Sequence, residues 1–166
     1  SFGSMPLGNG DIGMNVWTEP NGDILFYISK VNAFDAGHEL PKLGRIRMRF
    51  EPALNTSVSF RQELSLRDAS IFIEGDGVEL ELCVSANQPL IYLKGKSKTQ
   101  RKITYTLEPL RPINKKLEAD KGTEGVLLDC ASNGMGWAYV NHSSVWGENL
   151  RKQNTAEFVA KAKDPI

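Results

Sequence analysis

The chain has 166 residues, and its 20 Lys and Arg residues balance its 20 Asp and Glu residues, so the formal net charge at pH 7 is zero. This length suits one domain with a sizeable apolar core, and the balanced charge offers no long-range field that would attract nucleic acid or an anionic membrane. No run of 18 apolar residues occurs, so we expect no segment that spans a bilayer and no nucleic-acid or membrane partner.

A glycine-rich run near the start of the sequence extends from Met5 to Trp17. Its glycines at positions 8, 10 and 13 have the G-x-G-x-x-G spacing of a dinucleotide-binding loop, which follows a strand and opens a helix. Residues 14–18 instead favour a short strand that enters a turn at residues 20–22. The run therefore predicts a tight lead-in to the first strand, locked by hydrogen bonds of Asn9 and Asp11, and we expect no cofactor.

Most of the following sequence predicts strands of an antiparallel sheet. Apolar and polar residues alternate in the run from Arg45 to Phe50, where the even positions are apolar and the odd positions are arginines. The same period of two occurs at residues 58–67, 78–85 and 102–108. Three short runs are apolar on both sides and predict central strands covered on both faces, at residues 24–28, 90–93 and 126–128.

Turn-forming residues separate these segments at regular distances, which favours hairpins over crossover helices. They occur at residues 21–23, 74–77, 87–89 and 132–134. Helix is scarce, and short helical turns are expected only at residues 113–119 and 145–152. Because roughly ten strands in one domain form two packed layers, we predict an all-β fold, a two-layer antiparallel β-sandwich, in a single domain that spans residues 1–166.

A basic segment at residues 94–102 lies between two of the expected strands. It could attract an anion, whereas a solvated turn between strands is the more common role of such a run.

The sequence shows no metal-binding pattern. His38 and Glu39 begin like the zinc motif H-E-x-x-H, but Lys42 stands where the second histidine is needed. Two cysteines, Cys83 and Cys130, define no disulfide framework, and two free thiols are favoured over a bridge. We therefore predict no metal site and leave the pairing of the cysteines open.

The run from Pro6 to Trp17 resembles the signature P-[IL]-G-N-G-x-[LI]-G-x-x-[VL]-[WFY], which opens the N-terminal β-sandwich of glycoside hydrolase family 95, the alpha-L-fucosidase and galactosidase family. The order of the strands at residues 43–48, 60–66 and 78–91 is similar too, so the resemblance covers residues 5–95. It implies a supersandwich of the galactose mutarotase type. Where family members carry an Asn-Glu-Asp-Thr-Leu-Trp-like segment, this chain has residues 28–36, with Phe34 at the aromatic place. The resemblance therefore implies a divergent relative rather than a true fucosidase.

The resemblance also implies where catalysis takes place, because the catalytic groups of that family lie in a following (α/α)6 barrel. We expect this chain to be the non-catalytic N-terminal domain of such an enzyme, with the catalytic domain of the same polypeptide as its partner and an oligosaccharide as a further ligand. Polysaccharide-degrading relatives are exported, which implies a periplasmic or extracellular location. The sequence starts at Ser1 without a signal segment, so we expect that a leader is missing.

The residues predicted to contact carbohydrate or the catalytic domain combine polar groups with aromatic platforms. They are Asn9, Asp11, Phe34, Trp137, His142 and Trp146. For each of the aromatic residues, packing in the core is the competing role. No carboxylate pair stands out as catalytic. Two other functions remain open: an autonomous carbohydrate-binding module, and a mutarotase-like epimerase that would need His38 or His142 beside a carboxylate.

Overall fold

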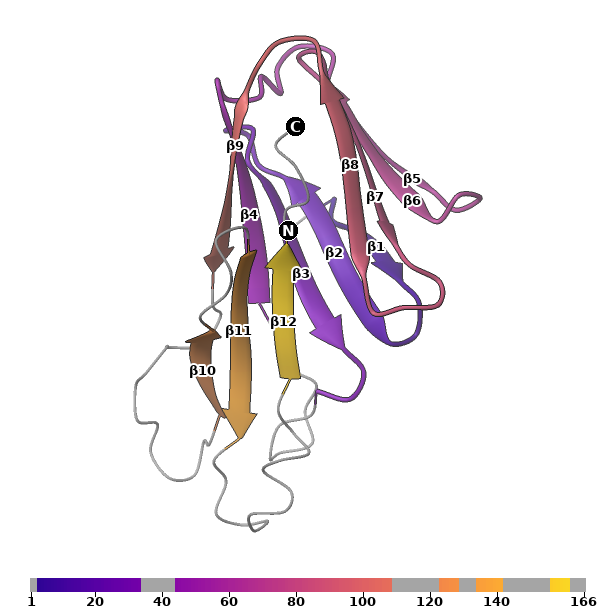
Figure 1. Ribbon diagram of the computed structural model, residues 1–166. Coiled ribbons are helices and arrows are strands. Elements are labelled where there is room, and N and C mark those ends of the chain that lie inside the picture. The colour runs from indigo at the N-terminus through magenta and orange to yellow at the C-terminus, as the bar shows by residue number, and fades with distance from the viewer. Residues whose placement is uncertain (1–2, 34–43, 109–122, 129–133, 142–155, 162–166) are drawn as a thin grey trace. The chain divides into compact units, whose positions relative to one another are not determined.

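The computed structural model describes residues 3–33, 44–108, 123–128, 134–141 and 156–161. Every regular element in these ranges is a strand, and no helix occurs among them (Figure 1). The strands belong to two compact units, of which the first contains Ser1–Ile28 and Arg45–Glu108 and the second contains Ser29–Gly44 and Pro109–Pro165. The helical turns expected at residues 113–119 and 145–152 lie outside the described residues.

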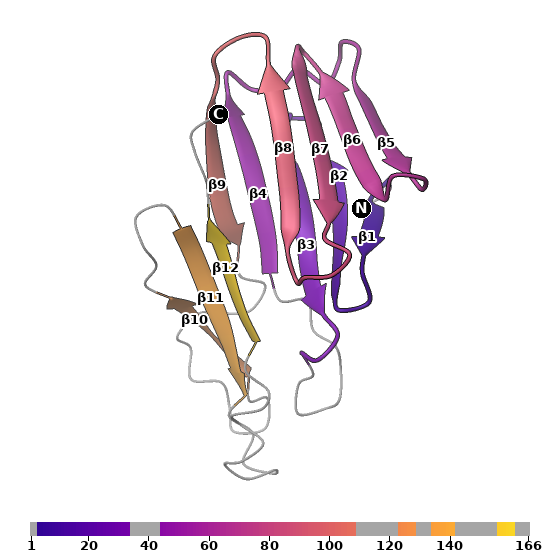
Figure 2. The same ribbon diagram turned by 45° about the vertical axis from the view of Figure 1, so that its right-hand side comes forward.

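The first unit consists of two antiparallel sheets. The five-stranded sheet has the order β1-β2-β3-β4-β9, with β1 (Met5–Gly8), β2 (Ile12–Thr18), β3 (Ile24–Lys30), β4 (Gly44–Glu51) and β9 (Lys102–Glu108). The four-stranded sheet has the order β5-β6-β7-β8, with β5 (Arg61–Ser65), β6 (Ser70–Gly75), β7 (Val78–Val84) and β8 (Ile91–Ser97). The sheets lie face to face as two layers (Figure 2). This confirms the predicted all-β antiparallel β-sandwich.

Alternation along the strands places the core between the two sheets. On β4, Ile46, Met48 and Phe50 are at most 4% exposed, while the arginines between them lie on the opposite face of the sheet. On the other sheet, Val78, Leu80 and Leu82 of β7 are buried in the same way. Burial of each large apolar side chain stabilises the fold by about 1.5–3 kcal/mol. The period of two in the sequence therefore determines which faces meet.

Strand β3 is buried on both faces, as its continuous apolar sequence predicts. Ile24, Leu25, Phe26 and Ile28 are all at most 6% exposed. The strand lies between β2 and β4 in the middle of the five-stranded sheet. Its prediction as a central strand is confirmed.

Three other strand predictions are wrong. The apolar run at residues 126–128 predicts a central strand, but it belongs to β10 (Thr123–Leu128), which lies at an edge of its three-stranded sheet. In the apolar run at residues 90–93, Leu90 lies just before β8 and the other three residues belong to β8, which is an edge strand; Leu90 and Tyr92 are each 45% exposed. The long strand expected at residues 58–67 is shorter in the structure, where β5 covers only Arg61–Ser65. Val58 lies before it and Leu66 after it, and the two residues are 58% and 86% exposed.

A glycine is required in the turn between β2 and β3. Gly22 has φ of 86°, and a β-carbon at this position would collide with the carbonyl oxygen of Leu54. The backbone N–H of Gly22 donates to the carbonyl of Glu19 at 2.9 Å, and Glu19 N–H donates to the carbonyl of Asp23 at 2.8 Å. The tight turn thus brings the loop after β4 against the hairpin, where only a glycine fits.

The second unit contains a three-stranded antiparallel sheet in the order β10-β11-β12. Its strands are β10 (Thr123–Leu128), β11 (Gly134–Asn141) and β12 (Ala156–Lys161). The register places Trp137 of β11 between Leu127 of β10 and Phe158 of β12.

Candidate functional site

The glycine-rich run of the sequence forms β1, β2 and the hairpin turn between them, and Asn9 is the centre of this turn. Its side-chain Oδ1 accepts hydrogen bonds from the backbone N–H groups of Asp11 at 2.9 Å and Ile12 at 2.8 Å. Its Nδ2 donates to the carbonyl oxygens of Ser85 at 2.7 Å and Gln88 at 3.1 Å. The first pair of bonds closes the turn, as predicted for this residue. The second pair reaches the loop between β7 and β8, in the other sheet.

Asn9 therefore joins the two layers of the sandwich. A carboxamide has two N–H donors and an oxygen with two lone pairs, and all four are used here. The adjacent Gly10 has φ of 90°, which a glycine adopts at no steric cost. A sugar hydroxyl could bond Asn9 only by replacing one of these four hydrogen bonds. The polar groups of the Asn9 side chain are therefore used to hold the fold together.

The structure brings together two of the residues predicted to contact carbohydrate or a partner domain, Asn9 and Asp11, which share the β1–β2 turn. Asp11 is half-buried. Trp137 belongs to β11, of which the backbone is described. The others lie outside the described residues: Phe34, His142 and Trp146, as well as His38. The contacts predicted for all of these residues stay predictions.

A network of arginines and carboxylates covers the outer face of the five-stranded sheet. Asp23, 3% exposed, accepts hydrogen bonds from Arg47 Nη1 at 2.9 Å and from Arg49 Nη2 at 3.0 Å. Arg47 also donates to Glu19 at 2.7 Å and to Glu108 at 2.5 Å. These bonds connect the β2–β3 hairpin with β4 and β9. The opposite charges of the network balance one another.

The pKa values in this network favour the charged forms. Hydrogen bonds from Arg49 hold the pKa of Asp23 below its usual value, against the opposing effect of burial, and Arg47 acts in the same direction. Burial raises the pKa of Glu108, but hydrogen bonds from Arg47 and Arg45 outweigh it and lower the pKa. Hydrogen bonds to Glu108 and Glu19 raise the pKa of Arg47. Asp23, Glu108 and Arg47 are thus held in their charged forms, which suits cross-strand stabilisation rather than proton transfer.

The same outer face carries an aromatic pair. The rings of Trp17 and Tyr27 are 5.0 Å apart at an interplanar angle of 40°, and the guanidinium of Arg45 lies 5.9 Å from the centre of the Tyr27 ring. Trp17 is only 8% exposed. Such a pair packs as part of the sheet and offers no open platform for a sugar ring.

Sequence reasoning missed this network. The alternating arginines of β4 are visible in the sequence, but Asp23 precedes them by more than twenty residues and Glu108 follows them by about sixty. A cross-strand ion pair depends on which strands become neighbours, and no local pattern carries that information.

Cys83 is a free, half-buried thiol, in agreement with the favoured prediction, while Cys130 lies outside the described residues. Within the described part of the chain, no cluster of three or more His, Cys, Asp or Glu side chains could hold a metal ion. No helix long and apolar enough to cross a membrane is found in that part either.

Comparison with protein families matches the whole chain, residues 1–166, to one family, which is described as Domain of unknown function (DUF5703). A comparison with curated proteins found no match. Since the match extends over the full sequence, the chain belongs to the family DUF5703_N.

Proposed function

We propose that this chain is a non-catalytic domain of a secreted glycoside hydrolase, in which it supports a catalytic barrel on the same polypeptide. The observation that carries the proposal is the use of the glycine-rich motif. Its residues resemble the opening signature of the family 95 β-sandwich, and its central side chain, Asn9, makes four hydrogen bonds that hold the two layers together. A motif used in this way builds a rigid scaffold.

The distribution of charge supports the same proposal. On the outer face of the four-stranded sheet, Lys96 pairs with Glu79 at 2.9 Å and Lys94 pairs with Glu81 at 3.6 Å. On the outer face of the other sheet, Arg47 binds the carboxylates of Asp23 and Glu108. Glycoside hydrolysis needs two carboxyl groups with separated pKa values on either side of one bond. The carboxylates described above are paired with cations on neighbouring strands, an arrangement that stabilises a sheet rather than one that prepares a pair of carboxyl groups for hydrolysis.

The experiment compares the natural full-length polypeptide with the purified 166-residue chain. Both are incubated with plant and host-glycan oligosaccharides, and released sugars are measured. We expect hydrolysis by the full-length protein and none by the chain. In the full-length protein, Asn9→Ala should lower the temperature at which activity is lost, while Asn15→Ala on an exposed position of β2 should not. Hydrolysis by the chain alone, or full activity of a polypeptide that lacks it, would refute the supporting role.

An autonomous carbohydrate-binding module is the second candidate, because the first unit contains a pocket with polar groups at its mouth. Titration calorimetry of the chain with neutral oligosaccharides separates the two functions. Saturable binding that survives removal of every other domain would favour the binding module. Absence of heat with all neutral sugars would favour the scaffold.

A further inference from the structure

Strand β5 is an edge of the four-stranded sheet, because β6 pairs with it on one side only. Along its other side, every second residue of the strand directs its N–H and C=O groups away from the sheet. Among the described residues no strand pairs with this side, and Figure 2 shows β5 as the outermost strand of its layer. Such an edge is able to pair with a strand of another chain.

Residues of opposite charge alternate along this edge. Arg61 and Glu63 lie on the outer face of the sheet, where both are exposed and their side chains form an ion pair along the strand. Gln62 lies between them on the inner face, and its side-chain oxygen accepts a hydrogen bond from the hydroxyl of Thr18 at 2.9 Å. The edge therefore carries one cation and one anion, placed symmetrically about Gln62.

Exposed apolar residues flank the strand at both ends. Leu66, in the turn after β5, and Val58, in the loop before it, are the most exposed large apolar residues in the part of the chain that the structure describes. Both are separated from Gln62 by the same number of residues. A partner strand laid along this edge would remove part of this apolar surface from water, which is favourable.

Among the registers that pair most of β5 with a second copy of itself, only one avoids like charges. Antiparallel strands related by a two-fold axis keep their faces, so one residue lies opposite its own copy. If that residue is Arg61 or Glu63, like charges meet, and if it is Leu64, Arg61 comes opposite Arg67 of the partner copy. If it is Gln62, Arg61 of each copy lies opposite Glu63 of the other, which is a stabilising cross-strand pair.

The same register also matches the apolar residues. It places Phe60 opposite Leu64 on the inner face, where both are half-buried in the single chain. At each end it brings Val58 of one copy beside Leu66 of the other. The charges on the outer face and the apolar groups on the inner face and at the ends therefore select the same axis independently.

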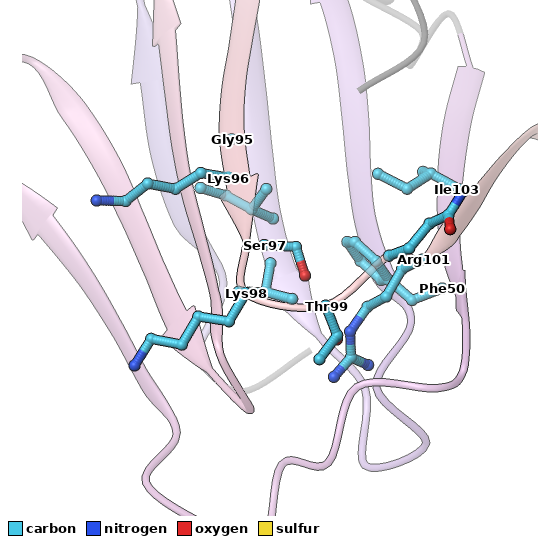
Figure 3. Close-up of a pocket in the computed structure, with 11 residues that line it drawn as sticks. Phe50, Gly95, Lys96, Ser97, Lys98, Thr99, Arg101 and Ile103 are labelled. Carbon is cyan, nitrogen blue, oxygen red and sulfur yellow. The ribbon is translucent and has the colours of Figure 1, made fainter.

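The opposite edge of this sheet, β8, lacks such a match. Its outer face carries Lys94 and Lys96, so a second copy of β8 would place lysines opposite lysines. Figure 3 shows Lys96 and Lys98 extending to the same side, beside a pocket where β8 turns into β9. This edge therefore repels its own copy, whereas β5 attracts it.

The edges of the five-stranded sheet are less suited as well. Strand β1 contains Pro6, which has no N–H to donate. On β9, the register without like charges would pair Lys102 with Glu108, whose carboxylate is already bound by Arg45 and Arg47. Of the edges in the first unit, β5 thus offers the best fit to a second copy.

We propose that two copies of this chain associate through β5, with Gln62 at the two-fold axis, so that their four-stranded sheets join into one continuous antiparallel sheet. Because a strand pair of this length buries less than the roughly 1,200–2,000 Å² of a stable interface, we expect a weak dimer with a dissociation constant on the order of 10–100 μM. This surface does not depend on the proposed function of the domain.

The test is sedimentation equilibrium of the purified chain at concentrations from about 5 to about 500 μM, on either side of the expected dissociation constant. We expect the mass to rise from 18.4 kDa toward twice that value. A chain that stays monomeric over the whole range would overturn the proposal.

Charge reversal tests the register. Arg61→Glu and Glu63→Arg each place like charges opposite one another at two positions of the dimer, so each should weaken association at least about tenfold. A mixture of the two variants should associate within about threefold of the wild type, because every pair between the copies then joins opposite charges. The chain that carries both substitutions should also associate like the wild type, for the same reason.

Lys96→Glu, on the outer face of β8, is the matched control and should change the dissociation constant by less than about twofold. Circular dichroism checks that each variant is folded, which we expect because the substituted side chains are exposed. Equal association of both single variants and the wild type, or a mixture of the two that does not associate, would refute pairing about Gln62 and with it the proposal.

Discussion

Replacement of Asn9 by Ala tests whether one side chain joins the two sheets. The change removes four hydrogen bonds, of which three are at least partly buried. With a net contribution of about 0.5–1.5 kcal/mol each, the three buried bonds predict a loss of roughly 2–4 kcal/mol in the free energy of unfolding. This is a large part of the stability of a typical domain, about 5–15 kcal/mol. For a chain of this size it corresponds to a fall in Tm of roughly 5–15 °C.

The measurement is urea unfolding followed by circular dichroism, with thermal unfolding as a second probe. Asn15→Ala is the matched control, because Asn15 is an exposed residue of β2 close to the same turn, and it should change stability by less than about 0.5 kcal/mol. A loss below about 1 kcal/mol for Asn9→Ala, with an unchanged dependence on urea, would refute the role of Asn9 as a connection between the layers.

Asn9→Asp distinguishes the contribution of the turn to stability from the contribution of the contact between the sheets. A carboxylate keeps the two bonds accepted from Asp11 and Ile12 but cannot donate to Ser85 and Gln88. If the connection between the sheets matters, this variant loses at least about 1 kcal/mol although its turn remains closed. If only the turn matters, it is as stable as the wild type.

Three further predictions concern stability. Gly22→Ala should cost about 2 kcal/mol or more, because the position has positive φ and a β-carbon would collide with Leu54; urea unfolding checks this, and a loss below about 0.5 kcal/mol would contradict the geometry. The folded pKa values of Asp23 and Glu108 are lowered, so these carboxylates stabilise the fold fully above their unfolded pKa values, about pH 4, and this stabilisation is lost as the pH falls through the folded values. Urea unfolding between pH 6 and pH 2 measures the loss of stability. Asp23→Asn should make stability fall less steeply with decreasing pH. Leu82→Ala should lower the free energy of unfolding by about 2–5 kcal/mol, because Leu82 is fully buried in the core. Leu66→Ala, at the exposed leucine after β5, should change it by less than about 0.5 kcal/mol in the same assay.

One feature of the candidate sites follows from a local sequence pattern, and another depends on contacts between distant segments. The turn at Asn9 could be predicted from the sequence, because an asparagine followed by glycine bonds its own backbone over two or three residues. The pocket where β8 turns into β9 could not. Its parts come from β4, from the β6–β7 hairpin and from the β8–β9 turn, and only folding brings them together.

The sequence by itself determined the strands and the faces that form the core. Period-two alternation, as from Arg45 to Phe50, is a local property, because successive side chains of a strand point to opposite sides whatever the strand pairs with. Only the tertiary structure decided which apolar strand is central and which lies at an edge, as β3 and β8 show. It also decided which loop Asn9 reaches, 76 residues away at Ser85. Both depend on the order of strands in the two sheets, which is set by contacts between distant segments and leaves no pattern in either segment alone.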